Sequence, residues 1–537
     1  MSSTEEQQFP VAHLRPTLDE QFSFRSDVSN NADNMALDAS AKTSLQSFVA
    51  TEEWFQKPLV VVVIGASGDL ARKKTYPSLF ELYQHGLLPK ETMIWGYART
   101  AKTHLEFRDH LHPHLTPGQI PTSSKKLKDF LELCYYHNGK SYGDNEAYAA
   151  MLGEITGMDT FNAKDANVLY YLAIPPNVFA ETVATLEGMP NAVVQGKTRF
   201  VIEKPFGRDT ASCQALLDGF KGLGEEMQFR LDHYLAKPMV ENLATLRMAN
   251  PFLENMWNHE HVESVHIRFK EPFGTQGRGG YFDQYNIIRD VLQNHLLQVL
   301  LLVAMELPSS LFDSAGDESD SFRQAKIEVL ERMPPIVLED ALLGQYDGYK
   351  DDPTIKNKDT NCPTYAALRC FVNSKRWKGV PFILEAGKAL DQKVVDVQVK
   401  FKNRHPFPSN MVTIEVQPKP SMTMTAHMKP LGGASGTMDV TTTNLTTDYS
   451  FDGSDDILSK PIENAYSRLL LDVLRGHQNN FVRSDELVRS WEVFTPLLHQ
   501  IERDNIQPVM YEYGSSGPSS RPAFMDEMVQ ANMKSSL

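Results

Sequence analysis

One short segment places an acid, an imidazole, a phenol and an amine close together: Asp232-His233-Tyr234-Leu235-Ala236-Lys237. A carboxylate can orient a general base. A neighbouring imidazole and amine can hold a dianion through charge-assisted hydrogen bonds. The segment therefore predicts a reaction site for a phosphorylated substrate, such as a sugar phosphate.

A second candidate site is the turn Gly65-x-x-Gly68-x-x-Ala71, which follows an aliphatic run and precedes a helical pattern. Small residues there let the backbone approach a pyrophosphate, and the helix start supplies N–H groups. A plain strand–helix turn is the alternative, because the spacing differs from Gly-x-Gly-x-x-Gly. A P-loop is excluded, since no Gly-Lys-Ser/Thr ends the motif. The residues expected to contact a dinucleotide are Gly65, Ala66, Ser67, Gly68, Asp69 and Leu70.

The residue after the second expected strand bears on the choice of nicotinamide cofactor. An acidic side chain there would bind the 2′-hydroxyl of NAD, but this chain has Arg99. A guanidinium suits a 2′-phosphate, and the hydroxyl of Ser67 can add a hydrogen bond. The prediction is NADP, and the alternative for Arg99 is a solvated surface charge.

Hydrophobic patterning around these motifs predicts an α/β Rossmann-type N-terminal domain. Residues 59–64 are a continuous aliphatic run, typical of a strand buried on both faces. Further strands are expected over 92–97, 167–174 and 198–203, with a helix over 70–85. Strands that alternate with helices form a parallel sheet covered on both faces.

The pattern changes after about residue 245, where polar and apolar residues alternate over 262–269, 395–401 and 412–417. A period of two is typical of half-exposed antiparallel strands. A long apolar helix is expected over 287–307. The C-terminal part is therefore predicted to be an α+β domain with a large, mainly antiparallel sheet. Such a sheet offers a flat face for dimer formation, although a monomer is equally compatible.

The chain of 537 residues is too long for a single core. We expect a disordered N-terminal extension over 1–55 and a dinucleotide-binding domain over 56–240. An α+β substrate and oligomerisation domain is expected over 241–512, followed by a loose tail over 513–537.

Composition excludes several classes of function. The net charge of −15 argues against nonspecific nucleic-acid binding and requires a locally positive pocket for an anionic substrate. The four cysteines lack zinc spacing and a disulfide framework, so we expect a reducing compartment and no metal site. The most apolar run, 296–305, is too short to cross a membrane and is interpreted as a buried helix.

The chain ends show no secretion signal, which favours the cytoplasm. The last three residues, Ser-Ser-Leu, are a loose variant of the peroxisomal Ser-Lys-Leu address. Chance is the favoured explanation of this ending, and import into a peroxisome-like organelle is the alternative.

Seven motifs in sequence order make the chain resemble the glucose-6-phosphate dehydrogenase family from residue 58 to about residue 513. They are GASGDLA (65–71), GYAR (96–99), EKPFG (203–207), RLDHYLAK (230–237), FKEPFG (269–274), RDVLQNHLL (289–297) and GKAL (387–390). The resemblance implies oxidation of glucose 6-phosphate at C1 to 6-phospho-D-glucono-1,5-lactone with reduction of NADP. This reaction opens the oxidative pentose phosphate pathway. A homodimer or homotetramer is expected.

The resemblance also implies the chemical roles of individual residues. His295 matches the base that removes the C1 hydroxyl proton as hydride leaves, and Asp232 matches the carboxylate that orients it. Lys204 is similar to the lysine that touches both substrate and nicotinamide, and the following Pro205 is implied to be cis. The residues that match the 6-phosphate site are His233, Tyr234 and Lys237. Further substrate contacts are implied for Glu271, Asp290, Lys388, Lys393 and Gln417.

Some members of this family bind a second, structural NADP through arginines and lysines of the C-terminal domain. The matching positions here are Glu385, Val394, Gln398, Glu415 and Ser516. Acidic and apolar side chains cannot hold a 2′-phosphate or a pyrophosphate. The second site is therefore predicted to be absent or weak.

Two other functions stay open at this point. Another NADP-dependent sugar oxidoreductase with a Glu-Lys-Pro motif would use lysine as its acid and base, so replacing His295 would have little effect. A non-catalytic NADP sensor would bind nucleotide without turnover. The intact acid, base and phosphate-binding residues argue against the sensor.

Overall fold

The computed structural model describes residues 45, 49–115, 124–158, 161–162, 165–189, 196–308, 320–403, 405, 407–430, 440–448, 462 and 464–535. Most of the expected N-terminal extension lies outside the described residues, as do the last two residues of the Ser-Ser-Leu ending. Residues from Gln46 onward form one compact unit.

Six parallel strands form the first sheet, in the order β3-β2-β1-β4-β5-β6. The strands are β1 (Leu59–Ile64), β2 (Thr92–Ala98), β3 (Cys134–Asn138), β4 (Asn167–Leu172), β5 (Thr198–Ile202) and β6 (Gln228–Arg230). The strand order reverses between β1 and β4, and doubly wound sheets bind ligands at the carboxyl ends of the strands beside such a reversal. The predicted Rossmann-type sheet is therefore confirmed, with the Gly-rich turn at its switch point.

Alternate residues of β1 explain why helices cover both faces of this sheet. Val60 and Val62 belong to one hydrophobic cluster, which includes residues of α5 and α6. Val61 and Val63 belong to the other cluster, which includes residues of α2, α3 and α13. The helical segments of this domain are η1 (Glu53–Gln56), η2 (Ala71–Thr75), α2 (Tyr76–Gln84), α3 (His104–Leu111), η3 (His112–His114), α4 (Ser124–Glu132), α5 (Asn145–Thr156), η5 (Pro176–Val178), α6 (Phe179–Glu187), α7 (Thr210–Asp218) and η6 (Glu225–Met227).

Nine strands form the second sheet, in the order β14-β13-β12-β11-β7-β10-β9-β8-β15. The strands are β7 (Val262–Lys270), β8 (Ala341–Tyr346), β9 (Tyr365–Cys370), β10 (Phe382–Gly387), β11 (Val394–Phe401), β12 (Met411–Gln417), β13 (Ser421–Met428), β14 (Thr441–Asp448) and β15 (Val509–Tyr511). Two pairs, β7 with β10 and β8 with β15, are parallel, and the others are antiparallel. The predicted large, mainly antiparallel sheet is confirmed.

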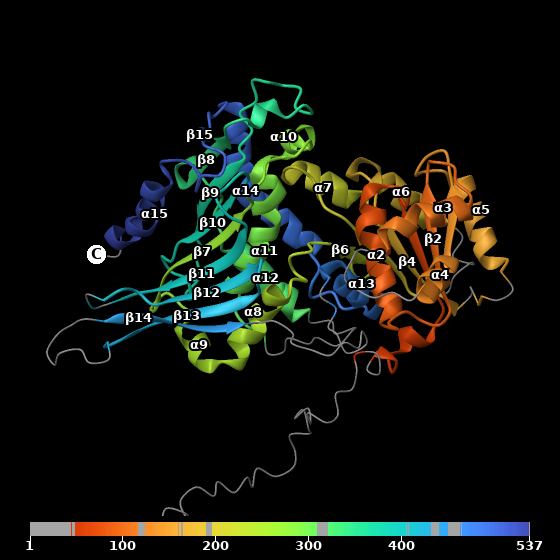
Figure 1. Ribbon diagram of the computed structural model, residues 1–537, viewed down its shortest axis with the longest axis horizontal. Helices are drawn as coiled ribbons and strands as arrows, with labels where there is room; N and C mark the ends of the chain where they lie inside the picture. The colour runs from red at the N-terminus through yellow and green to blue at the C-terminus, as the bar shows by residue number, and fades with distance from the viewer. Residues whose placement is uncertain are drawn as a thin grey trace, which may run out of the picture. The chain divides into compact units, whose positions relative to one another are not determined.

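Helices α11 and α12 lie on one side of this sheet and α15 lies on the other (Figure 1). The helical segments of this part are α8 (Pro238–Ala249), α9 (Pro251–Met256), α10 (Gly279–Ile287), η7 (Ile288–Leu296), α11 (Leu297–Ala304), α12 (Ser321–Leu330), η8 (Leu338–Asp340), η9 (Tyr349–Asp351), α13 (Ala465–Arg475), α14 (Ser484–Arg503) and α15 (Arg521–Ser535). The run Gly279–Ala304 is long and apolar enough to span a membrane, but 89% of its apolar window is buried in the protein. It is therefore packed as a core helix, as expected for 296–305.

Two C-terminal helices correct the expected domain limits. Helix α13 packs against α2, and its leucines join a core cluster of the first sheet, so the chain returns to the N-terminal domain late in the sequence. Helix α15 occupies most of the expected loose tail, and that expectation is wrong for this segment. One contact that holds α15 in place comes from Arg521, whose Nε donates to the buried Glu385 carboxylate over 2.6 Å.

Candidate active site

A π-helical segment, η7, places Asp290 and His295 on the same side of their helix. π-Helices bond residue i to residue i+5, so residues five apart lie almost one above the other. In an α-helix the same two side chains would point about 140° apart. Both side chains contact one amine: Lys204 Nζ lies 3.0 Å from His295 Nε2 and 3.5 Å from Asp290 Oδ1.

His295 and Asp232 form a buried pair, with His295 Nδ1 2.5 Å from Asp232 Oδ1. Because a carboxylate accepts, Nδ1–H donates and Nε2 is left to accept a proton. Burial would raise the pKa of Asp232, but the charge and hydrogen bond of His295 hold that pKa below its ordinary value. Burial lowers the pKa of His295, and Lys204 adds to that effect against the attraction of Asp232. The imidazole is therefore kept as an unprotonated base.

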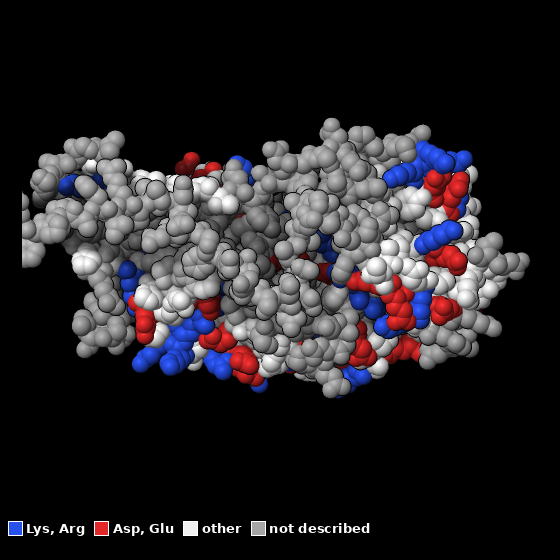
Figure 2. Space-filling view, turned by 90° about the horizontal axis from the view of Figure 1, so that it is seen from below, with Lys and Arg blue, Asp and Glu red and all other residues white. Residues whose placement is uncertain are grey.

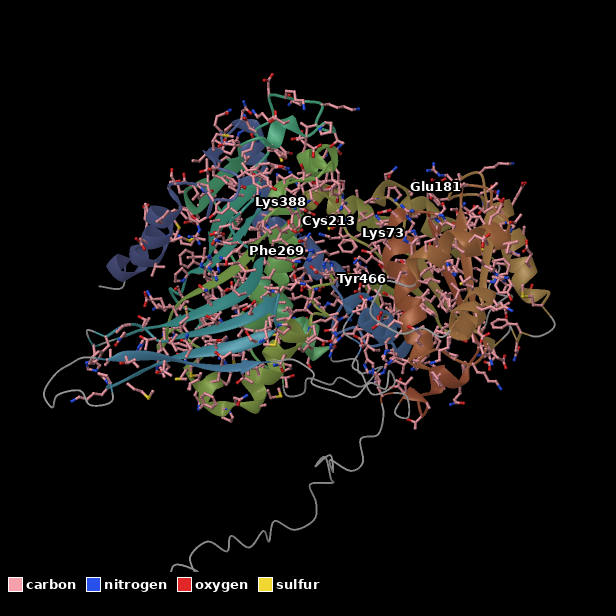
Figure 3. All side chains as sticks on the ribbon, viewed as in Figure 1. Lys73, Glu181, Cys213, Phe269, Lys388 and Tyr466 are labelled. Carbon is pink, nitrogen blue, oxygen red and sulfur yellow. The ribbon has the colours of Figure 1, made fainter. Side chains whose placement is uncertain are left out.

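The pair adjoins a pocket of about 460 Å³. Two residues of its wall are labelled in Figure 3: Phe269 lies on β7, and Lys388 follows β10. Figure 3 also labels Tyr466, which lies on α13. The predicted site residues that line the pocket are Lys204, His233, Tyr234, Glu271, Asp290, His295, Lys388, Lys393 and Gln417. Asp232 does not line it and reaches it through His295. Lys237 is adjacent, with its Nζ 5.9 Å from the centre of the Tyr234 ring.

One wall of the pocket carries polar groups that bind each other. Lys388 Nζ donates to Glu271 Oε2 over 2.6 Å, and the Tyr234 hydroxyl donates to Gln417 Oε1 over 3.4 Å. Burial would raise the pKa of Asp290, but neighbouring lysines hold it below its ordinary value, so its carboxylate accepts hydrogen bonds. These donors and acceptors suit the hydroxyl groups of a sugar.

Positive charge gathers beside this wall. The pKa of Lys237 is lowered by burial and by the charges of Lys74 and Lys393. The pKa of His233 is also lowered, by burial and then by the charges of His295 and nearby lysines. Within the described residues, no carboxylate lies within 4.0 Å of the amines of Lys74, Lys237 or Lys393. Such a group of cations suits a dianion, such as a phosphate.

Lys74 was missed by the sequence reasoning, although it lines the pocket. It lies in η2, a π-helical segment directly after the Gly-rich turn, and its Nζ is 5.9 Å from the centre of the Tyr466 ring. A plain α-helical pattern over 70–85 gave no reason to single it out. The run of three basic residues at 72–74, beside the switch point, was the available signal.

Asp232, His233 and His295 have potential metal-ligating atoms within 4.8 Å of one another. Two of these atoms already bond each other, and the Lys204 ammonium occupies the remaining nitrogen of His295. A cation would meet the positive charge of Lys204 there. The arrangement therefore suits an oriented base better than a metal centre.

The Gly-rich turn follows β1 at the carboxyl edge of the first sheet. Gly65 has φ +88°, and a Cβ there would come within 2.3 Å of the Ala173 carbonyl oxygen, so only glycine fits. Ile64 of β1 pairs with Tyr97 of β2, which brings Arg99 to the same edge. The Arg99 guanidinium lies over the Tyr142 ring at 5.3 Å and, among the described residues, has no carboxylate within 4.0 Å. The turn therefore fits a pyrophosphate, and Arg99 fits an additional phosphate.

Asp69, a predicted cofactor contact in the Gly-rich turn, has a side chain that is already engaged by charged neighbours. Its carboxylate forms ion pairs with Arg72 at 2.6 Å and with Lys73 at 3.0 Å. These partners hold the pKa of Asp69 below its ordinary value, although its slight burial acts the other way. The negative charge is thereby compensated at the turn, and Asp69 can contribute its backbone there.

The fold and site together define an oxidoreductase with a Rossmann-type domain for a nicotinamide dinucleotide. The family model for the NAD binding domain of glucose-6-phosphate dehydrogenase matches residues 62–242, and the model for its C-terminal domain matches residues 244–532. The chain belongs to the glucose-6-phosphate dehydrogenase family, as the seven motifs predicted. The Lys204–Pro205 peptide is cis, as that resemblance implied.

Relatives match over most of their length. Glucose-6-phosphate 1-dehydrogenase of Drosophila melanogaster is 43% identical over 481 residues, which cover 86% of this chain and 88% of the relative. The chloroplastic enzyme 1 of Arabidopsis thaliana is 41% identical, with 87% and 83% covered. A solved glucose-6-phosphate dehydrogenase in complex with its substrate glucose 6-phosphate has a TM-score of 0.80 and 38% identity, covering 88% of this chain and 98% of the other.

Proposed function

We propose that this protein oxidises glucose 6-phosphate at C1 to 6-phospho-D-glucono-1,5-lactone, with NADP as the hydride acceptor, and so begins the oxidative pentose phosphate pathway. The observation that carries the proposal is the buried Asp232–His295 pair beside a pocket in which Lys74 and Lys393 have no carboxylate within 4.0 Å among the described residues. The relatives and the solved complex with glucose 6-phosphate support the choice of substrate.

In the proposed reaction, His295 Nε2 accepts the proton of the C1 hydroxyl. Asp232 stabilises the imidazolium that forms and fixes the ring through Nδ1. Lys204, which donates to the same Nε2, is assigned to the anomeric oxygen once substrate occupies the pocket. When bound, NADP supplies the electrophilic carbon that takes the hydride. Bulk solvent has little access to the pair, because His295 and Asp232 are each 3% exposed.

The phosphate of the substrate is assigned to the cationic side of the pocket. His233, Lys237 and Tyr234 are joined there by Lys74 and Lys393, and the dianion would relieve the repulsion that lowers the pKa of Lys237. Glu271, Asp290, Lys388 and Gln417 are assigned to the sugar hydroxyls.

The decisive assay mixes the protein with glucose 6-phosphate and NADP and follows absorbance of the reduced nicotinamide. Rapid reduction is expected, with unphosphorylated glucose as the matched control that gives little. Equal rates with the two sugars would contradict the proposed phosphate site. Absence of reduction with glucose 6-phosphate would contradict the proposed function.

The finer proposal for the cofactor is one NADP per subunit, without a strongly bound structural NADP. Glu385, at one of the matching positions, is fully buried and already binds Arg521 and His266. Asp396 lies on β11, on the other side of β7 from Glu385, and pairs with Arg268 of β7 at an N–O distance of 2.5 Å. A phosphate brought to this face would meet charges that are already neutralised. Equilibrium titration with NADP should give one site per chain, and a second tight site would contradict this.

The proposed assembly is a homodimer or homotetramer in the cytoplasm. The sheet side opposite α11 and α12 is the proposed contact face, and light scattering of the purified protein measures the assembly (Figure 1). Basic and acidic side chains are interspersed on the face in Figure 2, which supports the proposal that nucleic acid is not a partner. Import into a peroxisome-like organelle through the Ser-Ser-Leu ending is the alternative location, and imaging of a protein with Leu537 deleted would test it.

A further inference from the structure

A second, smaller cavity is lined by Asp232, which does not line the substrate pocket, and it shares Lys204 with that pocket. Its volume is about 20 Å³, which is room for about one water molecule. Val482, Leu487 and Trp491 supply much of its apolar wall. Polar groups also line it, and they come from Asp232, Gln298 and Ser490 among others. A small cavity with several polar groups is the kind of site that holds an ordered water.

The two carboxylate oxygens of Asp232 differ in their partners. Oδ1 accepts from His295 Nδ1 and from the Tyr234 N–H, the latter over 2.9 Å. Oδ2 is buried and has no hydrogen-bond partner among the described residues. A buried carboxylate oxygen without a donor destabilises the folded state, so a donor at this oxygen would be favoured.

Two buried hydrogen bonds orient the side-chain amide of Gln298 in this wall. Its Nε2 donates to Glu486 Oε1 over 2.7 Å, and its Oε1 accepts from Lys326 Nζ over 3.1 Å. Lys326 and Glu486 form an ion pair at 3.2 Å in which both side chains are 0% exposed. Nε2 carries two hydrogens, and the contact with Glu486 uses one of them.

The Lys326–Glu486 pair has no role in the proposed reaction. Burying two charges carries a large desolvation penalty, so such a pair is weak evidence for added stability. Its position is informative, however, since the pair joins α12 to α14 and holds Gln298 of α11 between them. The geometry of this pair fixes which way the Gln298 amide points.

We propose that the cavity binds one water molecule, which donates to Asp232 Oδ2 and accepts from the Gln298 amide, with Ser490 as a further partner. Gln298, oriented by Lys326 and Glu486, is then a positioning residue for the Asp232–His295 pair. The kinetic part of this inference rests on the proposed dehydrogenase function, because it assigns His295 as the base.

The water has a defined electrostatic effect. A donor at Oδ2 draws negative charge away from the carboxylate, which weakens the attraction that Asp232 exerts on protonated His295. Removing the water therefore raises the apparent pKa of His295. Since the base must be unprotonated, activity would then be lost at a higher pH as the solution is acidified.

Two substitutions remove the water in different ways. Gln298→Met keeps a side chain of similar length without the amide, and Val482→Leu adds a methylene that fills the cavity while leaving its polar groups in place. Each should move the acidic limb of the kcat profile upward by about 0.5 to 1 pH unit, the equivalent of one hydrogen bond. KM for glucose 6-phosphate should change less than about twofold, since no pocket residue is altered.

Val482→Ala is the matched control, because it enlarges the same cavity and leaves the water in place. Its acidic limb should stay within about 0.2 pH unit of the wild type, well below the shift expected for a lost hydrogen bond. An unmoved limb in Val482→Leu, or an equal shift in the Val482→Ala control, would overturn the inference. If Gln298→Met does not fold, Val482→Leu decides the kinetic test.

A crystallographic readout is independent of activity. A high-resolution crystal structure of the wild type should show one water within hydrogen-bond distance of Asp232 Oδ2, and the Val482→Leu structure should lack it. Absence of that water in the wild type refutes the site even in an active enzyme. If the water is present but the protein does not reduce NADP with glucose 6-phosphate, the water site stands and the proposed function is refuted.

Discussion

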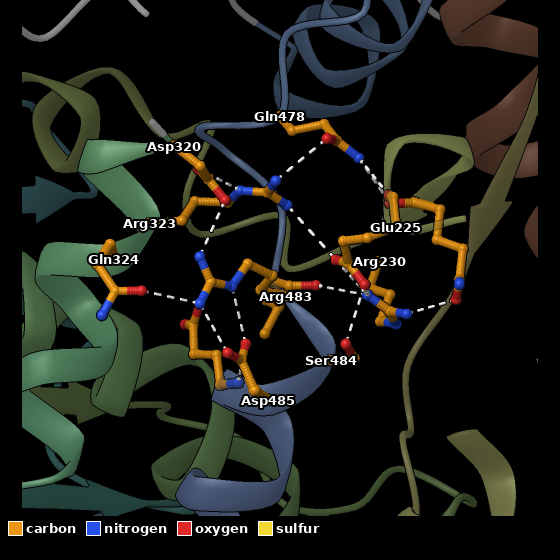
Figure 4. Close-up of polar contacts among 12 residues, drawn as sticks. Glu225, Arg230, Asp320, Arg323, Gln324, Gln478, Arg483, Ser484 and Asp485 are labelled. Carbon is orange, nitrogen blue, oxygen red and sulfur yellow. Dashed lines mark hydrogen bonds and ion pairs between the residues drawn. The ribbon is translucent and has the colours of Figure 1, made fainter. Parts of the chain in front are cut away.

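Two groups of basic residues in this protein use their charges in opposite ways. One group, which we call the arginine cluster, contains Arg230, Arg323 and Arg483 (Figure 4). Its arginines pair with Glu225 at 2.8 Å, with Asp320 at 2.9 Å and with Asp485 at 2.6 Å, respectively.

The other group, the lysine cluster, contains Lys74, Lys237 and Lys393 at the substrate pocket. Its amines have no such partner among the described residues, and their mutual repulsion helps to lower the pKa of Lys237. Charges that are paired with carboxylates hold the chain together, whereas charges left unpaired beside a pocket are available to an anionic ligand. The unpaired lysines are therefore the candidates for binding an anion, whereas Lys204 and Lys388, which pair with Asp290 and Glu271, are assigned to oxygens of the sugar.

The arginine cluster also supports the reaction site indirectly. Arg230 precedes Asp232 by two residues, and its carbonyl oxygen accepts from the Val482 N–H over 3.1 Å. Its Nη1 in turn donates to the Val482 carbonyl oxygen over 3.2 Å. The cluster thus fixes the segment that carries Asp232, without any of its charges facing the pocket.

The largest expected effect comes from the base itself. His295→Asn should lower kcat by roughly a thousandfold or more, because the C1 proton then has no acceptor. KM for glucose 6-phosphate should change little, and steady-state kinetics with saturating NADP measures both constants. A variant that keeps near wild-type kcat would instead support a sugar oxidoreductase in which Lys204 is the acid and base.

Removing a charge from the arginine cluster should affect stability rather than substrate binding. Arg230 is 1% exposed, and Arg230→Met leaves the Glu225 carboxylate without its closest partner. Because Glu225 is 30% exposed and keeps Arg323 and Ser484 as partners, losing the charged hydrogen bonds of Arg230 should destabilise the protein by about 1 to 3 kcal/mol. Thermal or urea unfolding should show this loss, while KM at a temperature where the variant is folded stays unchanged. A large change in KM with normal stability would break the proposed division between the two clusters.

The lysine cluster should respond in the opposite way. Lys74→Ala should raise KM for glucose 6-phosphate by roughly 10- to 100-fold, the value of one charge-assisted hydrogen bond. Unfolding should be almost unaffected. Lys221→Ala is the matched control, since Lys221 is a surface lysine paired with Asp218 at 3.0 Å, and it should leave both quantities unchanged. If the slow reaction with unphosphorylated glucose falls as much as that with the phosphate ester, Lys74 does not bind the phosphate.

Sequence patterns predicted the parts of this protein that depend on local chemistry. The aliphatic run of β1 and the alternating pattern of the later strands predicted the two sheets. The family motifs predicted most of the pocket residues. Pocket residues that lie in π-helical segments were harder to predict from the sequence. Lys74 and the common orientation of Asp290 and His295 depend on π-helical segments, and a period of 3.6 residues does not anticipate them.

Long-range packing limited the rest of the sequence prediction. Helix α13 returns to the first domain because its leucines pack against α2, which is far away in the sequence. Helix α15 is held by the ion pair of Arg521 with the buried Glu385 and by Phe524, Met525 and Met528, which pack in the core. The Ser-, Gly- and Pro-rich segment that precedes the helix gives no sign of these contacts. Both features are consequences of tertiary contacts, which composition and periodicity do not report.

Arg99 extends the comparison to the cofactor side, since it too has no carboxylate partner among the described residues. If an unpaired cation at a ligand site marks an anion contact, Arg99→Ala should raise KM for NADP by about tenfold, as for a lost exposed phosphate contact. KM for NAD should stay the same, because NAD lacks the 2′-phosphate. Side-by-side rates with the two nucleotides provide the measurement. Retention of the full NADP preference would mean that an unpaired arginine over an aromatic ring is a surface charge, and the rule drawn from the two clusters would then apply only inside pockets.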